Sequence, residues 1–589
     1  MSELIQNYFL KLFTLKERLG LKNFEIAKIL ENIAFYLEML DETKFRIRAF
    51  QNAAKIIESL PEDIADVYRR GEIRTIPGIG AAIAEIIGEL VDTGTAKIYQ
   101  EFKEKYPINI EELSAVEGLG PKRIKLLYEK LRIKNLEELE KAAREHRIRR
   151  IKTLGVKTEK NLLKAVEFAK KSKERLLLAY ADQIAGDLVE KLGSLSFVER
   201  ITVAGSYRRR KETVGDLDIL VVSKKPEAVM DYFTSLENVG IVLGKGPAKS
   251  SVLLKDGLQV DVRVFDEEIY GSALLYFTGS KEHNVKLRIV AMEKGLKLSE
   301  YGVFRDDKRI AGRTEEECYR ALGLSYIEPE LREDMGEVEA ARKNSLPQLV
   351  EYSEIKGDLH VHSNWSDGVN TILELVEAAR EKNYQYLCIS DHVGILKVAG
   401  AMDEENLRRQ MEEIDKLNSR LDDFRILKGA EVNITAEGGL DLSVGLLKEL
   451  DIVLAGIHTG FRASKEAITK RVIKAMESGL MHILVHPTGR IINRRAPYEI
   501  DLGAIMETAK ELDVALEVNA FPDRLDIRDV QIKSAVDRGI SLALGTDSHN
   551  RNHLNYMRFG VDQARRGWCT KRNLINALNL SEIERRFDI

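Results

Sequence analysis

The 589-residue sequence is poor in cysteine, proline and tryptophan, with three cysteines, 11 prolines and two tryptophans. The cysteines (Cys318, Cys388 and Cys569) are far apart and match no zinc or redox spacing, so reduced and partly buried thiols are expected. No long apolar run or secretory signal is present, and Leu4–Leu21 has the spacing of an amphipathic packing helix. These absences argue against a disulfide-based fold and a membrane anchor, and we expect a cytoplasmic protein.

The sequence also lacks an overall excess of one charge, since 91 Lys and Arg residues are balanced by 95 Asp and Glu residues, a net charge of −4. Residues 1–175 nevertheless carry 34 basic and 28 acidic side chains, and residues 113–175 alone carry 19 basic and nine acidic ones. A local basic segment attracts a phosphate backbone, so we expect nucleic acid to bind this part of the chain. The length predicts several domains.

Two acidic residues interrupt the apolar pattern of Val203–Val222, whose ends predict two strands joined by a Gly-Ser turn and a basic segment. Asp216 and Asp218 are two positions apart, so their carboxylates leave the same face of the predicted sheet. Asp261, in the apolar run Leu258–Phe265, offers a third carboxylate. Adjacent carboxylates suit Mg²⁺, which shares its coordination sphere with substrate phosphates. The three residues therefore meet the needs of two-metal nucleotidyl transfer.

A glycine-rich motif recurs in the first part of the chain. The segment Ile73–Ile87 contains Pro-Gly-Ile-Gly, Leu113–Leu127 repeats it as Glu-Gly-Leu-Gly, and a weaker third copy in Ile151–Leu163 keeps one glycine. Gly-x-Gly between two short helices lets the backbone approach a partner and points N–H groups at an anion. The repeats beside a basic segment favour a DNA-binding role, although helical turns also use glycine for steric reasons.

The last 240 residues or so alternate short apolar strands with amphipathic helices, which predicts a parallel barrel. The predicted strands are Lys356–Val361, Tyr386–Ser390, Arg425–Ala430, Asp451–Gly456, His482–Val485, Val514–Val518 and Ser541–Leu544. Nearly every strand end carries possible metal ligands, with Glu517 and Asn519 following the sixth strand and His482 expected to be structural. The candidate ligands are His360, His362, Asp367, His392, Glu431, His458, His486, Asp547 and His549. Imidazole with carboxylate favours Zn²⁺, Mn²⁺ or Fe²⁺, and these ligands suffice for up to three ions.

The segment with Gly-Ser, Arg-Arg and Gly-Asp-x-Asp resembles the nucleotidyltransferase palm of family X DNA polymerases, and Tyr276-Phe-Thr-Gly-Ser280 resembles the segment that this family packs against the incoming nucleotide. The resemblance implies that Asp216, Asp218 and Asp261 are catalytic and hold two Mg²⁺ or Mn²⁺ ions. The nucleotide contacts that it implies are Gly205, Ser206, Arg209, Gly215, Tyr276, Phe277, Gly279 and Asn284. Arg210 departs from the glycine of many members, and the role of Lys281 stays open.

The glycine repeats resemble the helix-hairpin-helix elements of the same family, which hold DNA phosphates without reading sequence. The DNA contacts implied are Phe50, Gly78, Gly80, Gly118, Gly120 and Lys122, with Phe50 at the place of an aromatic that stacks on a base. Some members carry a lyase lysine in the first repeat, where this sequence has Ile86, and a phosphate-contacting lysine where it has Ala82. A Schiff base needs an amine, so lyase activity is not expected.

The strand-end ligands resemble the polymerase-and-histidinol-phosphatase (PHP) domain, with all nine ligand positions filled. Arg490 and Arg524 lie in segments similar to its bacterial polymerase version and could grip a phosphate. The resemblance implies a 3′-to-5′ exonuclease, with removal of 3′-phosphates or cleavage at abasic sites as further activities.

Taken together, the resemblance implies a multidomain α+β and α/β chain: helix-hairpin-helix regions, a nucleotidyltransferase palm with thumb, and a distorted (β/α)₇ PHP barrel. The expected divisions are 1–22 (extension helix), 23–105 and 106–195 (DNA-binding), 196–265 (palm), 266–328 (thumb), 329–353 (helix-like linker) and 354–589 (PHP domain). We expect a monomeric polymerase that binds gapped DNA and dNTPs in base excision repair. The alternatives are a template-independent nucleotidyltransferase, and a barrel that is a small-molecule phosphatase or purely structural.

Overall fold

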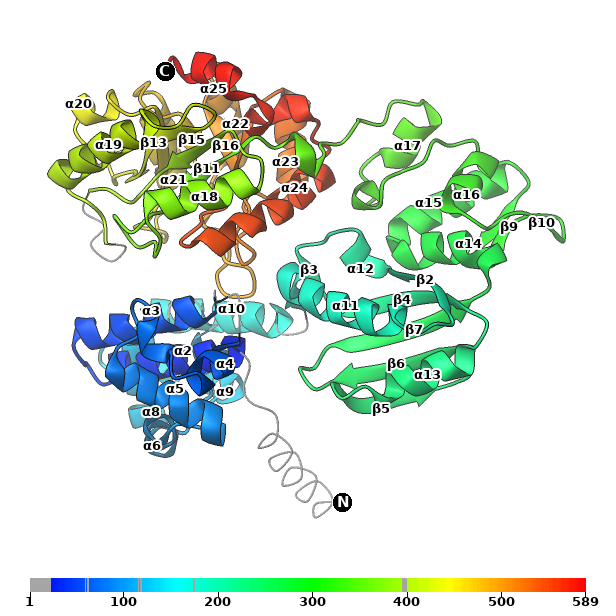
Figure 1. Cartoon of the computed structure of the whole chain (residues 1–589), viewed down its shortest axis with the longest axis horizontal. Coiled ribbons are helices and arrows are strands. Elements are labelled where there is room, and N and C mark those ends of the chain that lie inside the picture. The colour runs from blue at the N-terminus through cyan, green and yellow to red at the C-terminus, as the bar shows by residue number, and fades with distance from the viewer. Residues whose placement is uncertain are drawn as a thin grey trace. The chain divides into compact units, whose positions relative to one another are not determined.

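The computed structural model describes residues 23–58, 60, 63–114, 116, 119–172, 175–394 and 400–589, which form two compact units (Figure 1). The first unit lies within Met1–Ser172 with Asn493–Ala496, and the second comprises Lys173–Ile492 and Pro497–Ile589. The expected helix at Leu4–Leu21 falls outside the described residues. No helix in the described ranges is both long and apolar enough to cross a membrane. The finer division into seven segments stays a prediction.

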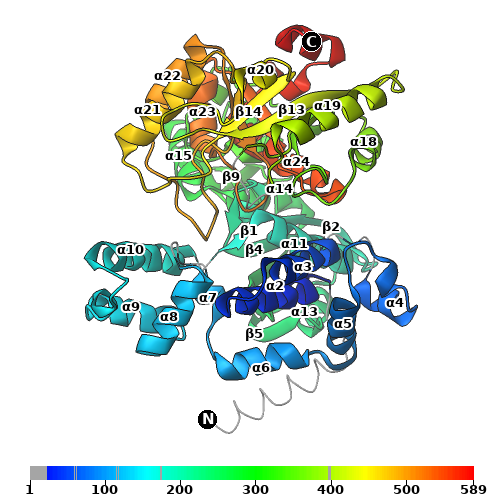
Figure 2. The same cartoon turned by 90° about the vertical axis from the view of Figure 1, so that its left-hand side faces the viewer.

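The described residues of the first unit up to Ser172 form helices joined by turns, as their amphipathic spacing predicts, and are drawn in blue to cyan in Figures 1 and 2. Its elements are α2 (Asn23–Met39), α3 (Lys44–Glu58), α4 (Ile64–Arg69), η1 (Ile73–Thr75), α5 (Ala81–Thr93), α6 (Lys97–Lys105), α7 (Ile110–Ser114), α8 (Pro121–Leu131), α9 (Leu136–Arg144), η2 (Ile148–Arg150) and α10 (Val156–Ser172). One apolar core forms between α2, α3 and α5, and a second around α8, α9 and α10.

Each of the three sequence repeats forms a hairpin of two helical segments. The pairs are η1 with α5, α7 with α8, and η2 with α10, so the weak third copy also folds in this way. Gly80 and Gly120 are the N-caps of α5 and α8, and neither helix receives a side-chain cap. The first-turn amides of both helices are thus left without the usual capping side chain.

The palm of the second unit is a five-stranded sheet of order β2-β4-β7-β6-β5. Its strands are β2 (Val198–Val203), β4 (Asp216–Ser223), β5 (Val239–Lys245), β6 (Lys249–Leu254) and β7 (Gln259–Phe265). The pair β4 and β7 is parallel and the other neighbours are antiparallel. Leu217, Ile219 and Val221 of β4 face the buried sides of α11 (Leu178–Gly193) and α13 (Pro226–Ser235), whereas Asp216 and Asp218 face the other way.

Two expectations for the palm and its neighbours need correction. The segment after β2 is a short helix, α12 (Gly205–Arg208), in place of a plain turn, and β3 (Thr213–Val214) pairs with β1 (Leu176–Leu177). The linker is not one helix, because η3 (Pro329–Leu331) and α17 (Glu337–Arg342) are separated by Gly336 at φ 99°. Proline starts the first segment, and a left-handed glycine before the second sets its direction.

The thumb follows the sheet and packs around its own apolar core. It consists of α14 (Glu267–Thr278), α15 (Lys281–Glu293), the small sheet β8 (Lys297–Ser299), β9 (Gly302–Arg305) and β10 (Lys308–Ala311), and α16 (Glu315–Ala321). Ser280 caps α15 by accepting a hydrogen bond from the N–H of His283. Tyr270 and Ala273 of α14 pack against Leu220 of β4, so α14 covers the sheet face that carries the two aspartates.

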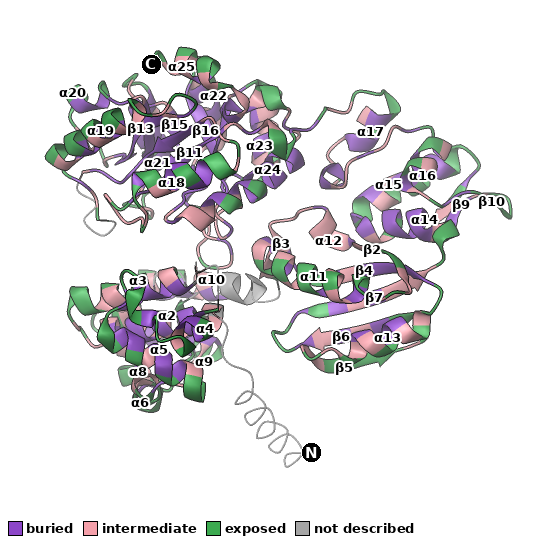
Figure 3. Cartoon of the chain, viewed as in Figure 1, coloured by how far each residue is buried: buried purple, intermediate pink, exposed green. Residues whose placement is uncertain are grey.

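The C-terminal domain has the seven parallel strands expected, with buried residues in purple in Figure 3. They are β11 (Gly357–Val361), β12 (Tyr386–Ile389), β13 (Arg425–Asn433), β14 (Ile452–Gly456), β15 (Ile483–Leu484), β16 (Ala515–Asn519) and β17 (Leu542–Gly545). The helices between and after them are α18 (Ile372–Glu381), α19 (Glu404–Asn418), α20 (Val444–Leu447), α21 (Lys465–Met476), α22 (Leu502–Glu511), α23 (Asp529–Arg538), α24 (Met557–Arg566) and α25 (Leu580–Phe587). A parallel bridge between Val361 and Ser548 joins the first strand to the segment after the last. The strand ends therefore form a nearly closed ring.

Candidate metal and nucleotide sites

Three carboxylates meet on one face of the palm sheet. Asp216 and Asp218 alternate with Leu217 on β4, and the parallel register places Asp218 opposite Asp261 on β7. Burial, followed by the charges of Asp216 and Asp261, raises the pKa of Asp218 to about 6. Such repulsion is relieved when a divalent cation binds between the carboxylates, so the cluster fits Mg²⁺ or Mn²⁺.

Two cations lie beside the third carboxylate. Arg263 Nη2 is 3.0 Å and Lys249 Nζ is 3.4 Å from Asp261 Oδ2. Although burial acts in the opposite direction, hydrogen bonds from Ser251 and Gln259 and these charges lower the pKa of Asp261. Asp261 is therefore ionised at neutral pH even without a bound metal ion, as a metal ligand must be.

The predicted triphosphate contacts lie on and after α12. Gly205 has φ 66°, the left-handed region that favours glycine, and a Cβ at this position would be in van der Waals contact with Asp218 Oδ2 at 3.4 Å. Arg209 Nε donates to Glu333 Oε1 at 2.8 Å and its Nη1 donates to the Thr278 carbonyl. These contacts fix the Arg209 guanidinium between the palm and the end of the thumb.

The predicted sugar and base contacts lie at the start of the thumb. The Tyr276 side chain is 38% exposed, and its ring packs edge-on against Phe277 at a centroid distance of 5.2 Å. Asn284 Nδ2 donates to the Tyr276 carbonyl at 2.7 Å. Gly279 has φ 72°, and a Cβ there would lie 3.1 Å from Arg209 Nη1. The glycine thus lets the aromatic segment approach the arginine of the phosphate side.

A pocket of about 770 Å³ joins these two sides. Its lining contains the predicted residues Gly205, Ser206, Arg209, Asp216, Asp218, Tyr276, Phe277, Gly279 and Asn284, together with Lys281. Gly215 and Asp261 are not in this lining; a Cβ at Gly215 would lie 2.9 Å from Arg175 Nη1. The volume suits a nucleotide-sized ligand.

Sequence reasoning missed several residues of this pocket. Arg175 lines it and donates from Nη2 to the Thr213 carbonyl at 2.7 Å, and Arg288 and Glu333 line it from the thumb and the linker. Arg528 and Arg566 of the C-terminal domain also line it. No local motif marks these residues, because folding alone brings them to the palm.

Arg210, the departure that the sequence left unexplained, connects two domains. Its φ of 55° is the left-handed conformation that favours glycine. Its guanidinium pairs with Asp182 on α11 at 3.0 Å and with Asp562 on α24 at 2.6 Å. Gln563 Nε2 donates to the Arg210 carbonyl at 3.2 Å. The side chain therefore holds helix α24 against the palm.

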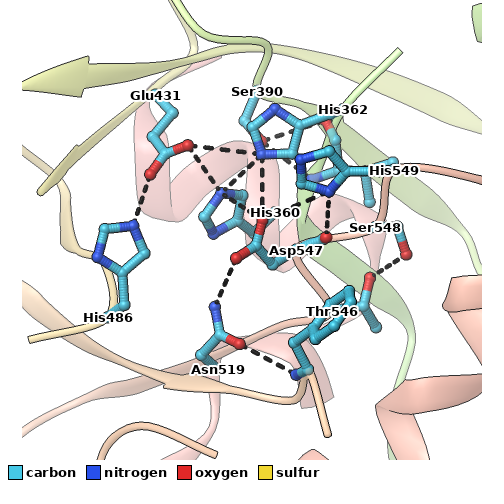
Figure 4. Close-up of polar contacts among 12 residues, drawn as sticks. His360, His362, Ser390, Glu431, His486, Asn519, Thr546, Asp547, Ser548 and His549 are labelled. Carbon is cyan, nitrogen blue, oxygen red and sulfur yellow. Dashed lines mark hydrogen bonds and ion pairs between the residues drawn. The ribbon is translucent and has the colours of Figure 1, made fainter. Parts of the chain in front are cut away.

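The second site lies at the strand ends of the barrel (Figure 4), where Glu431 of β13 lies among histidines. Glu431 Oε1 is 2.7 Å from His486 Nε2 and 2.8 Å from His458 Nε2. Glu431 Oε2 is 3.0 Å from His392 Nδ1 and 3.4 Å from His360 Nε2. One carboxylate can thus bridge ions held by different histidines.

Asp547 and Asp367 complete the ligand set. Asp547 Oδ1 is 3.4 Å from His362 Nε2, and Asp367 Oδ2 is 3.2 Å from His549 Nε2. Among the described residues, possible ligand atoms within 4.8 Å of one another form overlapping groups. The groups are His362, Asp367, His392 and His549; His360, His362 and Asp547; and His392, Glu431 and His458.

The hydrogen bonding and protonation of the histidine rings fit the binding of metal ions at this site. In the described ranges, Nδ1 of His362, of His458 and of His486 is buried without a hydrogen-bond partner. Burial lowers the pKa of His362 and of His486 to about 4, so both rings are neutral at pH 7. Neutral imidazoles beside carboxylates are the ligands that Zn²⁺, Mn²⁺ and Fe²⁺ prefer.

Glu517, noted at a strand end but given no role by the sequence, supports this ligand set. Its Oε1 is 2.6 Å from His360 Nδ1, and its Oε2 accepts the His486 backbone N–H at 2.6 Å. The first contact leaves His360 Nε2 directed at the other ligands. Asn519 Nδ2 donates to Asp547 Oδ2 at 3.2 Å and orients that carboxylate. In the sequence, Glu517 and Asn519 cannot be distinguished from ligands. Only the distances in the structure show that they support the ligands instead.

The two predicted phosphate-binding arginines lie in different surroundings. Arg524 Nε is 3.2 Å from Asp547 Oδ2, beside the metal ligands. Arg490 Nη2 donates to Glu212 Oε2 of the palm at 2.8 Å and to the Leu525 carbonyl. Phosphate binding by either residue stays a prediction, and the surroundings favour Arg524.

The predicted DNA contacts of the first unit are partly supported by their placement. Gly78, at φ 86°, and the N-caps Gly80 and Gly120 lie at the hairpin turns, whereas Gly118 falls outside the described residues. Lys122 is exposed, and its pairing with Asp41, by hydrogen bond and charge, raises the pKa of its amine. DNA binding by these residues remains a prediction.

Phe50 and Ile86 were the two other positions of interest in this unit. The Phe50 ring is 4% exposed and packs in the core of α2, α3 and α5, so the expectation of base stacking needs correction for this structure. Ile86 lies on α5 and packs against the same core. Its apolar side chain offers no nucleophile for a lyase reaction.

Family models match five segments of the chain. "DNA polymerase beta palm" matches residues 181–271 and "DNA polymerase beta thumb" matches residues 273–333. "Helix-hairpin-helix domain" matches residues 21–96, and "SAM-like helix-hairpin-helix tandem" matches residues 110–167. "PHP domain" matches residues 358–520, the part of the barrel that contains all the ligands except the last two.

Similar proteins agree with this arrangement. The chain is 38% identical over 564 residues to the DNA polymerase/3′-5′ exonuclease PolX of Bacillus subtilis (strain 168). The aligned residues cover 95% of this chain and 98% of that protein. It is 32% identical over 203 residues to a "probable phosphatase" of Thermoanaerobacter sp. (strain X514), covering 33% of this chain and 78% of that protein. A "probable phosphatase" of Proteus mirabilis (strain HI4320) is 31% identical over 207 residues, covering 33% of this chain and 80% of that protein.

The palm, thumb and hairpins define a nucleotidyltransferase polymerase, and the barrel defines a metal-dependent phosphoesterase joined to it. The chain belongs to the family X DNA polymerases that carry a C-terminal PHP domain.

Proposed function

We propose that this protein is a DNA-directed DNA polymerase that fills short gaps, with a 3′-to-5′ exonuclease in its PHP domain. The observation that supports the proposal best is the presence of two complete ligand sets in one chain: the aspartate cluster of the palm and the histidine–carboxylate ring of the barrel. A relative that matches 95% of the chain has the name DNA polymerase/3′-5′ exonuclease.

In the palm, Asp216, Asp218 and Asp261 would hold two Mg²⁺ or Mn²⁺ ions. Such ions, when bound, lower the pKa of a primer 3′-OH and stabilise the pyrophosphate leaving group. Arg209 and Ser206 bind the triphosphate, and the fixed position of Arg209 against Glu333 lowers the cost of ordering it. Tyr276 and Asn284 limit where the sugar and base can lie.

In the barrel, the eight residues of the overlapping ligand groups, together with His486 beside Glu431, would hold up to three ions of Zn²⁺, Mn²⁺ or Fe²⁺. Bound ions of this kind activate water and polarise a phosphodiester for hydrolysis. Arg524, beside Asp547, is placed to bind a phosphate oxygen, and Glu517 keeps His360 oriented. A primer 3′ end shortened here becomes a substrate for the palm again.

The helix-hairpin-helix elements of the first unit support binding of gapped DNA through its phosphates, because their helix starts offer backbone amides. Gap filling combined with end trimming suits base excision repair, and we place this activity in the cytoplasm with the protein as a monomer. The buried, free thiols in the described residues fit a reducing compartment.

The similarity of the barrel to proteins named "probable phosphatase" favours a second activity, removal of a terminal phosphate. A phosphate monoester and a phosphodiester require the same metal chemistry, so the site allows both. A template-independent transferase is disfavoured, because the hairpin and thumb matches accompany the palm.

The experiment compares Asp218→Asn and Asp547→Asn with the wild type on a gapped duplex with a labelled primer. We expect Asp218→Asn to lose primer extension by about a thousandfold or more and to keep degradation, because a neutral amide cannot replace a carboxylate ligand. Asp547→Asn should lose degradation and keep extension.

Asp231→Asn on α13 and Asp537→Asn on α23 are the matched controls, since both carboxylates are largely exposed. They should retain both activities. The proposal fails if Asp547→Asn degrades the primer at the wild-type rate, or if Asp218→Asn still extends it.

A further inference from the structure

The nucleotide pocket of the palm has a wall that comes from the PHP domain. Arg528, Asp529 and Val530 at the start of α23, with Gln563 and Arg566 at the end of α24, line the same pocket as the catalytic aspartates. We propose that Arg528 belongs to the polymerase site and contacts the triphosphate of the incoming nucleotide. This assignment rests on the polymerase function proposed above and adds a residue from the nuclease domain to it.

The PHP wall is held firmly against the palm. The buried Arg566 donates from Nη1 to Glu333 Oε1 at 3.1 Å, the same oxygen that Arg209 Nε contacts at 2.8 Å, and also donates to the Arg209 carbonyl. Asp562, one turn earlier on α24, pairs with Arg210. Charge-assisted contacts of this kind keep the palm turn and the PHP helices in one arrangement.

A chain of contacts connects Arg528 to the residues proposed to bind the triphosphate. Its Nη2 is 3.7 Å from Oε1 of Glu212, the residue before Thr213. The Thr213 carbonyl accepts a hydrogen bond from Arg175 Nη2 at 2.7 Å, and the same nitrogen is 3.4 Å from Ser206 Oγ. Arg528 is therefore connected to Ser206, the proposed phosphate contact, through Glu212, Thr213 and Arg175.

The Arg528 guanidinium is available for a ligand. Its side chain is 51% exposed, and its 3.7 Å distance from Glu212 exceeds that of a hydrogen bond. Glu212 has a closer partner in Arg490, at 2.8 Å, so it does not depend on Arg528. Arg209 and Arg566 both contact Glu333, so the Arg528 guanidinium has fewer close contacts within the protein than either of them. A guanidinium in this position can form paired hydrogen bonds to phosphate oxygens.

The test uses the full-length protein on a duplex with a one-nucleotide gap and Mg²⁺, and measures KM for dNTP, kcat and inhibition by inorganic tripolyphosphate. We expect Arg528→Ala to raise KM about tenfold and to weaken tripolyphosphate inhibition, with a smaller change in kcat. The KM of Arg528→Lys should lie between those of the wild type and Arg528→Ala, because lysine keeps the charge but cannot form the paired hydrogen bonds. Degradation of the primer should not change.

Arg538→Ala is the matched control, since Arg538 ends the same helix and pairs with the exposed Glu507 at 3.7 Å. It should leave KM unchanged. The assignment is overturned if Arg528→Ala and Arg538→Ala have the same KM and the same tripolyphosphate inhibition, or if Arg528→Ala changes kcat and the melting temperature alone. If the wild type does not extend the primer at all, the proposed function fails instead.

Discussion

The palm and the barrel balance their charges in different ways. The arginines after β2 each have an internal partner: Arg208 pairs with Glu315, Arg209 with Glu333 and Arg210 with Asp562. The carboxylates of the barrel instead lie mainly among imidazole rings, of which His362 and His486 are neutral at pH 7, and Glu431 alone lies within 3.5 Å of five histidines.

This difference suggests that the two sites are assembled in different ways. In the palm, ion pairs within the protein hold the turn after β2, where the triphosphate contacts are predicted, and the aspartate face has the carboxylates that would take a cation. In the barrel, metal ions held by these ligands would supply the positive charge that keeps the ligands together. Metal removal should therefore affect the stability of the barrel more than that of the palm.

The largest expected effect is on metal-dependent stability. Adding Mn²⁺ to the chelated protein should raise the melting temperature of the PHP domain by about 10 °C or more, because up to three bound ions each stabilise the folded state. Asp218→Asn should keep this shift, whereas Glu431→Gln should lose most of it, since Glu431 contacts ligands of all the groups. A calorimetric scan of both variants with and without Mn²⁺ checks this. If Asp218→Asn abolished the Mn²⁺-dependent rise in melting temperature and Glu431→Gln retained it, the palm and not the barrel would depend on metal for its stability.

The next effect concerns acid stability of the palm. Burial of the Glu315 carboxyl opposes ionisation, but the charge of Arg332 and hydrogen bonds from Arg208 lower its pKa to about 2. Since the folded pKa lies below the unfolded one, this group stabilises the protein above about pH 4.5, and the contribution is lost as the pH falls toward 2. The difference in unfolding free energy between wild type and Glu315→Gln should shrink by ~3 kcal/mol over this range.

Denaturant unfolding of both proteins between pH 6 and pH 2 measures the difference, with the exposed Glu316→Gln as the matched control. The unfolding free energy of Glu316→Gln should differ from that of the wild type by the same small amount at every pH. A difference for Glu315→Gln that does not depend on pH would show that its ion pairs do not hold the palm turn.

The smallest effect tests a supporting residue of the barrel. Glu517→Gln keeps the size of the side chain but weakens the contact with His360 Nδ1, so degradation should fall ~10- to 100-fold with extension unchanged. Gap-filling and primer-degradation rates from one preparation check both halves of this expectation. Equal loss of the two activities would point to general destabilisation, and no loss would remove Glu517 from the site.

The sequence predicted the barrel site better than the palm pocket, for a physical reason. The barrel ligands lie at or shortly after the ends of their strands, so a strand pattern and a strand-end residue type suffice to place His392 or Asp547. The seven strands and the hairpins, including the weak third repeat, were likewise visible as periodic patterns. The role of Glu517 was not, because it depends on one distance to His360.

Only part of the palm pocket could be predicted from the sequence. Asp216 and Asp218 are adjacent on a strand and were found from their spacing, but the residues opposite them come from remote segments. Glu333, Arg528 and Arg566 reach the pocket only because the linker and the PHP helices pack against α12. The buried position of Phe50 also could not be read from a motif, since it is decided by the packing of three helices.

The most direct test of the two-centre account measures the turnover of a dNTP to its monophosphate on gapped DNA. The wild type should release monophosphate, since a nucleotide added at the palm is removed at the barrel. Asp218→Asn, which still degrades the primer but adds no nucleotide, and Asp547→Asn should each release no monophosphate derived from the added dNTP, and a mixture of the two should restore this release. Continued release by Asp547→Asn alone would contradict the account, because the nucleotide would then be removed without the barrel.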